Sequence, residues 1–200
     1  MSILISTLVR AAYPLGVFRH RNFAFVWGST TLVGMGTQME AVVLGWYILT
    51  LTDSPFLVGL ISATRMSLNI LALFAGAIAD RVPRQRLLAT VEFVMAFLGV
   101  MMLLLILSGR LEVWHIFVIA MFAGMVRVFQ MPSSQSMVAD ILPRDRIGNG
   151  AAISTVGMNL AMLIGPLAGA LLFNSFGPKG AYMAIASLYF LSGLFALGIR

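Results

Sequence analysis

The sequence contains no cysteine and very little charge, and both shortages exclude whole classes of protein. Without cysteine the chain has neither a disulfide nor a thiolate metal site. Charged residues make up 10% of the 200 residues, whereas soluble domains carry about 25%. Too little polar surface is available to face water, so most side chains must face lipid or other helices.

Signals of enzymes and of nucleic-acid binding are missing as well. The sequence has no Ser/His/Asp order, no H-E-x-x-H and no phosphate loop. His20 and His115 fall at opposite membrane interfaces in the topology below, so they cannot share a metal. The net charge of +6 comes from arginines in short gaps between apolar runs, not from a basic soluble face. We therefore expect no enzyme, no cofactor and no nucleic-acid partner.

Long apolar runs are what the chain has in abundance. Hydrophobic residues make up 60% of it, and the mean hydropathy is +0.98. A helix needs about 20 residues to cross ~30 Å of hydrocarbon. Six runs reach that length: 24–49, 55–79, 87–108, 113–137, 151–173 and 181–199. The gaps are short, so successive helices should run antiparallel. The sequence predicts an all-α membrane protein, with a cytoplasmic segment 1–22 and a six-helix transmembrane bundle in 23–200.

Basic residues are distributed unequally between the two sets of loops. With the N-terminus inside, nine fall on the cytoplasmic side: Arg10, Arg19, Arg21, Arg81, Arg84, Arg86, Arg144, Arg146 and Arg200. Arg110 and Lys179 fall outside. This bias over short loops predicts that both termini lie in the cytoplasm of a bacterial inner membrane.

A short internal similarity favours an inverted repeat. Residues 74–78 (FAGAI) resemble residues 167–171 (LAGAL), about three helices later. Three-plus-three repeats of opposite topology build each half of some transporters.

The loop after the second run carries the most specific pattern. Gly76 stands one helical turn before Asp80, and Arg81, Arg84 and Arg86 follow. Glycine lets another helix approach closely, and the acid suits an arginine or a helix N-terminus. The cluster predicts a latch between helical bundles. The alternative is that these arginines only set the topology.

Three ordered motifs make the chain resemble the major facilitator superfamily. Gly76-x-x-x-Asp80-Arg81-x-x-Arg84-x-Arg86 resembles its motif A, although Pro83 replaces a common glycine. Arg127-Val-Phe-Gln130 resembles motif B, with Met131 in place of glycine. Gly165-Pro166-Leu-Ala-Gly169-Ala170 resembles motif C, with Ala170 for the last glycine. The segment 44–60 looks closest to the bacterial drug, macrolide and siderophore efflux branch.

The resemblance implies roles for these motifs. In motif A, Asp80 would be the latch acid, and Arg81 and Arg84 would pair with partners such as Asp140. Motif C is associated with antiporters, and Gly165, Pro166 and Gly169 would provide a bend and tight packing. An ordinary proline kink without a coupling role is the alternative.

Three charges fall deep inside the predicted helices: Glu40, Arg65 and Arg127. A charge at the centre of a bilayer costs about 2.5–3.5 kcal/mol on insertion scales, so it normally faces a cavity or a partner. We expect Glu40 to be a protonatable coupling site or a contact for cationic substrate. Arg127 and Gln130 would line the same pathway with Arg65. The alternative is a structural Glu40–Arg65 or Glu40–Arg127 pair. Glu92, about one turn inside the third run, is expected to join the cytoplasmic arginines as a structural group.

The function expected from these features is proton-coupled efflux of amphipathic, drug-like or siderophore-like molecules by alternating access. Its partners would be the lipid bilayer, a small-molecule substrate, protons and a second six-helix half, from a C-terminal half or a second copy. The rival hypothesis is a half-length, non-transporting scaffold or remnant. A channel is a weaker third option, since no repeated selectivity loop is visible.

Overall fold

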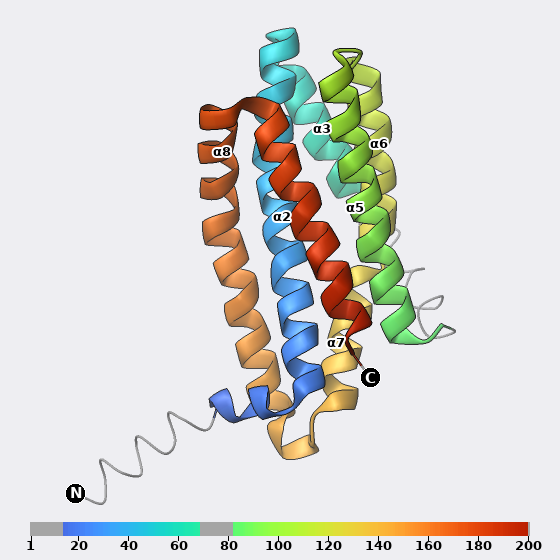
Figure 1. Cartoon of the computed structure of the whole chain (residues 1–200), viewed down its shortest axis with the longest axis vertical. Helices are drawn as coiled ribbons and strands as arrows, with labels where there is room; N and C mark the ends of the chain where they lie inside the picture. Colours follow the sequence, from blue (N-terminus) through green and yellow to red (C-terminus); the bar gives the residue numbers. More distant parts are fainter. Residues whose placement is uncertain (1–13, 69–81, 200) are drawn as a thin grey trace, which may run out of the picture.

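A computed structural model describes residues 14–68 and 82–199, and this part of the chain is helical. The helices lie side by side in a bundle (Figure 1). In chain order they are η1 (Pro14–Arg19), α2 (Arg21–Thr52), α3 (Pro55–Ser67), α5 (Arg84–Ser108), α6 (Val113–Arg127), α7 (Gln130–Ile141), η3 (Arg144–Arg146) and α8 (Ile147–Leu197).

Three helical segments of the described part are long and apolar enough to cross a membrane: Arg21–Thr52, Arg84–Ser108 and Arg144–Leu197. The last contains 54 residues, more than twice the roughly 20 that one crossing needs. The all-helical, apolar architecture agrees with the predicted fold class. The count of six spans and the three-plus-three repeat remain predictions.

The turns at one end of the bundle contain residues with a positive backbone φ angle. Asp53 closes α2 with φ 50°, and Gly109 closes α5 with φ 67°. Gly177 also has φ 67° and breaks the helical backbone inside α8. The chain therefore reverses direction at each of these residues, as the upper end of Figure 1 shows. The two runs predicted at 151–173 and 181–199 are the two arms of α8 on either side of Gly177.

The fourth apolar run is interrupted, whereas the sequence suggested one helix over 113–137. α6 ends at Arg127, and α7 begins at Gln130 and continues to Ile141. Pro132 supplies the physical reason, because it has no backbone N–H to donate to the carbonyl of Val128. The break places Arg127 and Gln130 at adjoining helix ends.

Glycines let the first arm of α8 pack directly against the backbone of α2. A Cβ atom added at Gly169 would lie 3.0 Å from the Met39 Cα and carbonyl oxygen. One added at Gly165 would lie 2.7 Å from the Gln38 Cβ. At this contact no side chain of α8 separates the two helix backbones, and the contact falls immediately before Glu40 in the chain.

Polar contacts tie several elements together at the other end of the bundle. Arg84 of α5 pairs with Asp140 of α7 at 2.5 Å. The Gln85 amide donates to the carbonyl of Ile199, just beyond α8. Arg146 of η3 donates to the carbonyl of Gly16 in η1 at 3.4 Å. The beginning of the described chain and the end of α8 thus share one end of the bundle (Figure 1).

Candidate functional site

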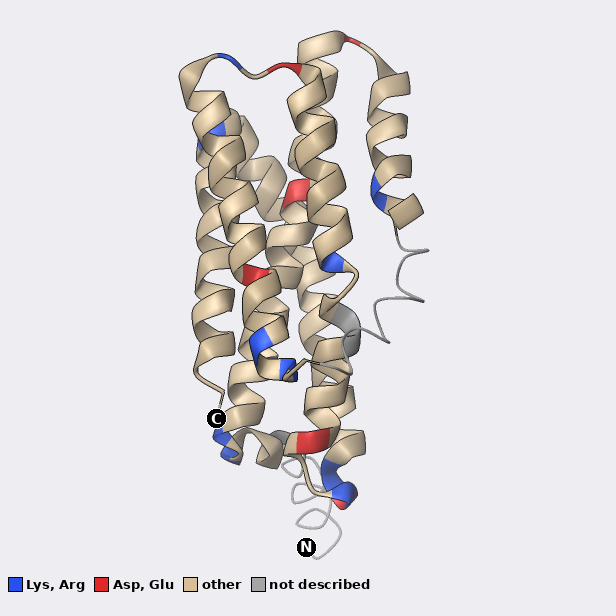
Figure 2. Cartoon of the chain, turned by 90° about the vertical axis from the view of Figure 1, so that its right-hand side faces the viewer, with Lys and Arg blue, Asp and Glu red and all other residues tan. Residues whose placement is uncertain are grey.

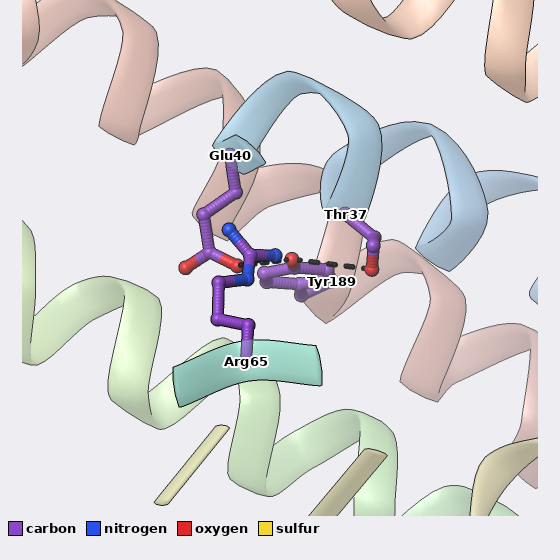
Figure 3. A network of polar contacts seen from close by, with 4 residues as sticks. All are labelled: Thr37, Glu40, Arg65 and Tyr189. Atoms are coloured by element: carbon purple, nitrogen blue, oxygen red, sulfur yellow. Dashed lines mark hydrogen bonds and ion pairs between the residues drawn. The ribbon is translucent and has the colours of Figure 1, made fainter. Parts of the chain in front are cut away.

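The centre of the bundle contains a buried ionic cluster around Glu40. This glutamate, on α2, is 5% exposed. Nη2 of Arg65, on α3, lies 3.6 Å from Glu40 Oε2. The Tyr189 hydroxyl donates to the same oxygen at 3.1 Å. Three helices therefore meet at a single carboxylate oxygen (Figure 3).

Tyr189 comes from the second arm of α8 and is completely buried. Its ring packs where a side chain at Gly36 would stand, since a Cβ there would lie 2.8 Å from Tyr189 Cε1. Thr37, the next residue of α2, has its hydroxyl 3.5 Å from the tyrosine oxygen. Figure 3 shows Thr37 and Glu40 on either side of the Tyr189 hydroxyl. Our sequence reasoning missed Tyr189, because a tyrosine in an apolar run carries no signal of its partner.

A cavity of about 650 Å³ lies beside this cluster. Residues of α2, α3, α6, α7 and α8 line it. Its charged and amide-bearing walls are formed by Gln38, Arg65, Arg127, Gln130 and Gln135. Glu40 is not among the lining residues and reaches the cavity wall only through Arg65. The cavity has the size of a small-molecule site.

Arg127 is half-buried at the end of α6 and lines the cavity, as Gln130 does one turn later. It lies within electrostatic range of Glu40, Arg65 and Tyr189. It makes neither a hydrogen bond nor an ion pair with any residue of the described part. Of the two pairs weighed for Glu40, the structure contains the one with Arg65.

Glu92 has a different environment from the one expected. It is fully buried, and the Ser29 hydroxyl donates to its Oε1 at 2.5 Å. Ser192, on α8, in turn donates to the Ser29 carbonyl at 2.9 Å. Serines of two other helices thus surround this carboxyl, where we expected cytoplasmic arginines. Glu92 lies eight residues beyond Arg84 and six beyond Arg86, about two helical turns deeper in the bundle than these arginines, which explains the difference.

Some residues of the predicted motifs lie outside the described part of the chain, and the others lie within it. Gly76, Asp80 and Arg81 lie outside the described residues, as does the segment 74–78 of the proposed repeat. Arg86 is exposed on the first turn of α5. α8 keeps helical backbone angles at Pro166, and its break comes later, at Gly177.

An ion pair inside apolar helices and a polar-walled cavity are features typical of substrate or ion pathways in membrane proteins. The family model described as "transmembrane secretion effector" matches residues 12–199. The chain therefore belongs to this family of major facilitator superfamily transporters, as its three motifs suggested.

Relatives in the superfamily include transporters of different cargo. An uncharacterised MFS-type transporter of Bacillus subtilis, YkuC, is 23% identical over 93% of this chain and 43% of its own length. A Na⁺, Li⁺, K⁺/H⁺ antiporter of Planococcus maritimus is 34% identical over 52% of this chain and 24% of its own. The multidrug resistance protein MdtG of a Rahnella strain is 26% identical over 88% of this chain and 43% of its own. The chain spans less than half the length of these relatives.

Proposed function

We propose that this chain is the N-terminal six-helix half of a secondary active transporter that exports amphipathic small molecules in a proton-coupled cycle. The observation that carries the proposal is the Glu40–Arg65–Tyr189 cluster next to the 650 Å³ cavity. A buried carboxylate whose partners come from two other helices links its charge to the packing of those helices. The relatives named for drug resistance and for cation/proton antiport favour the same kind of activity.

Proton uptake at Glu40 would act on the bundle through Arg65. A neutral carboxylic acid no longer forms an ion pair, so the attraction between α2 and α3 would weaken. The Arg65 side chain would then be free to move in the cavity wall. Loss of the proton would restore the pair. Such a two-state contact is the element that alternating access requires.

The second six-helix half completes the cavity in this proposal. It comes from a C-terminal continuation of the same chain or from a second copy, and the reading frame beyond Arg200 decides between them. The Arg84–Asp140 pair would belong to the latch of motif A at the cytoplasmic end. Gly165, Pro166 and Gly169 would let α8 bend against α2.

Transport measurements on the full-length protein test the role of Glu40. Inside-out vesicles with an imposed pH gradient are offered two pyrene dyes, one anionic and one cationic, and dye uptake is followed by fluorescence. The Glu40→Gln variant should lose gradient-driven uptake, because glutamine cannot exchange a proton. Glu112→Gln makes the same chemical change at an exposed residue and should transport like the parent protein. Undiminished, gradient-dependent uptake by Glu40→Gln would refute the coupling role.

A further inference from the structure

The charges on the cavity wall are of one sign. Arg65 and Arg127 both line the cavity, and none of its lining residues in the described part is acidic. Glu40 stands behind the wall, where it is 5% exposed and compensates Arg65. Glu40, Arg65 and Arg127 together therefore carry one net positive charge, and Arg127 is the arginine that forms no ion pair within the described residues.

An uncompensated guanidinium inside an apolar bundle is costly, by about 2.5–3.5 kcal/mol at the bilayer centre on insertion scales. Arg127 lies at the end of α6, some 15 residues from the turn at the opposite end. Its five N–H donors form a planar fork that matches a carboxylate, sulfonate or phosphate group. A bound anion would satisfy both the charge and the donors.

Neighbouring parts of the wall suit the rest of such a ligand. Gln38 and Gln130 add amide groups that accept or donate hydrogen bonds. Met158 and Met162, on the first arm of α8, present flexible apolar surface to the same cavity. The wall thus has a cationic, polar side formed by α2, α3, α6 and α7, and a side formed by α8 that presents Met158 and Met162.

We propose that the cavity binds an amphipathic anion whose acidic group is held by Arg127 and whose apolar body lies against α8. This inference rests on the proposed transport function and names its substrate class. It differs from the cationic substrate that Glu40 suggested from the sequence. An anionic molecule from the cytoplasm and the headgroup of an anionic lipid share the required chemistry.

Binding of two dyes that differ only in charge tests the assignment. The full-length protein is placed in phosphatidylcholine nanodiscs, and energy transfer from tryptophan to pyrenebutyrate or to a pyrenebutyl-trimethylammonium cation is measured against empty nanodiscs. The anion should bind about tenfold tighter than the cation. Arg127→Gln should weaken anion binding by about tenfold, because a charge-assisted contact is lost. Arg127→Lys should retain most of it, and Arg110→Gln, at an exposed loop residue, should behave like the parent chain.

Three results would overturn the assignment: a cation bound as tightly as the anion, unchanged anion affinity in Arg127→Gln, or no binding of either dye. Retained cation binding by Arg127→Gln shows that this variant is folded. Phosphatidylglycerol in the nanodiscs distinguishes the two sources. If the cavity binds the headgroup of an anionic lipid, phosphatidylglycerol should weaken pyrenebutyrate binding. If the cavity binds a soluble anion, the affinity for pyrenebutyrate should not change. Glu40-dependent uptake of the cationic dye by the full-length protein would end the anion assignment while leaving the transport proposal intact.

Discussion

Tyr189 and Tyr182 lie seven residues apart on the second arm of α8, and both are completely buried. They differ in what their hydroxyl groups contact. The Tyr189 hydroxyl bonds to Glu40, 149 residues earlier in the chain, whereas that of Tyr182 has no hydrogen-bond partner among the described residues. Comparing the two tyrosines therefore distinguishes what a hydroxyl contact contributes to the stability of the bundle from what a buried ring contributes.

Removing the Tyr189 hydroxyl should destabilise the bundle. Tyr189→Phe keeps the ring against Gly36 but loses the bond to the carboxylate, so the free energy of unfolding should fall by about 1 kcal/mol. Tyr182→Phe is the matched control and should cost nothing, or stabilise slightly, because it removes an unpaired polar group. Denaturant titration in detergent measures both changes. Equal losses in the two variants would show that the Glu40 contact contributes no stability.

Site residues could be predicted from the sequence where a charged side chain occurs within an apolar run. Glu40, Arg65 and Arg127 are charges in apolar runs, and the cost of burying a charge marks them as residues with a partner or a cavity. The choice between Arg65 and Arg127 as the partner of Glu40 needed the packing of α2 against α3. Tyr189 and Ser29 gave no such signal, because tyrosine and serine are common in membrane helices.

The contact between α2 and α8 dominates at the scale of elements. Its closest approach depends on Gly169, where an added Cβ would meet the Met39 backbone at 3.0 Å. Backbone atoms cannot rotate away as a side chain can. An added methyl group must therefore move one helix relative to the other.

Gly169→Ala should lower the thermal stability of the protein, with a cost of roughly 1–3 kcal/mol for overpacking. Gly59→Ala, on α3, is the control, since an added Cβ there meets nothing within 4 Å. That change should be neutral or stabilising by up to about 1 kcal/mol, as alanine is the better helix former. Unfolding of both variants in the same detergent gives the comparison. A Gly169→Ala variant as stable as Gly59→Ala would contradict the close approach.

Helices were easier to predict than their interruptions. Within the described residues the apolar runs predicted where helices form, and Asp53, Gly109 and Gly177 occur in the gaps between the predicted runs. The break after Arg127 was missed because the run 113–137 has the length of a single crossing, although hydropathy falls where α7 begins at Gln130. Pro132 was the available signal, but prolines are often accommodated within membrane helices, as Pro166 is here.

At the scale of the whole molecule, the two ends of the bundle differ in their basic residues, and this difference predicts how the bundle is oriented in the membrane. η1, η3, the beginning of α5 and the end of α8 are joined by contacts at one end of the bundle. Lysine and arginine cluster towards that end, although a few lie between the ends or at the other end (Figure 2). The positive-inside rule predicts that this end faces the cytoplasm.

The absence of native cysteine makes the orientation directly measurable. A cysteine introduced at the exposed Lys179 should react with a membrane-impermeant maleimide in intact cells. One introduced at the exposed Asp145, at the other end, should react only after permeabilisation. The unsubstituted chain gives the background. Labelling of Asp145→Cys in intact cells would reverse the predicted topology.

In the proposed transport cycle, the unpaired charge of Arg127 would also make the bundle sensitive to voltage. A potential of 100 mV does about 2.3 kcal/mol of work on each elementary charge that crosses the whole membrane field. Because Glu40 and Arg65 cancel one another, an empty cavity carries one net positive charge on its described walls. A bound monovalent anion would cancel that charge. The inside-negative potential of a bacterial cell would then exert a force on the charged, empty cavity and none on the neutral, loaded cavity. The membrane potential would therefore act on the return of the empty transporter and not on the step that carries the substrate.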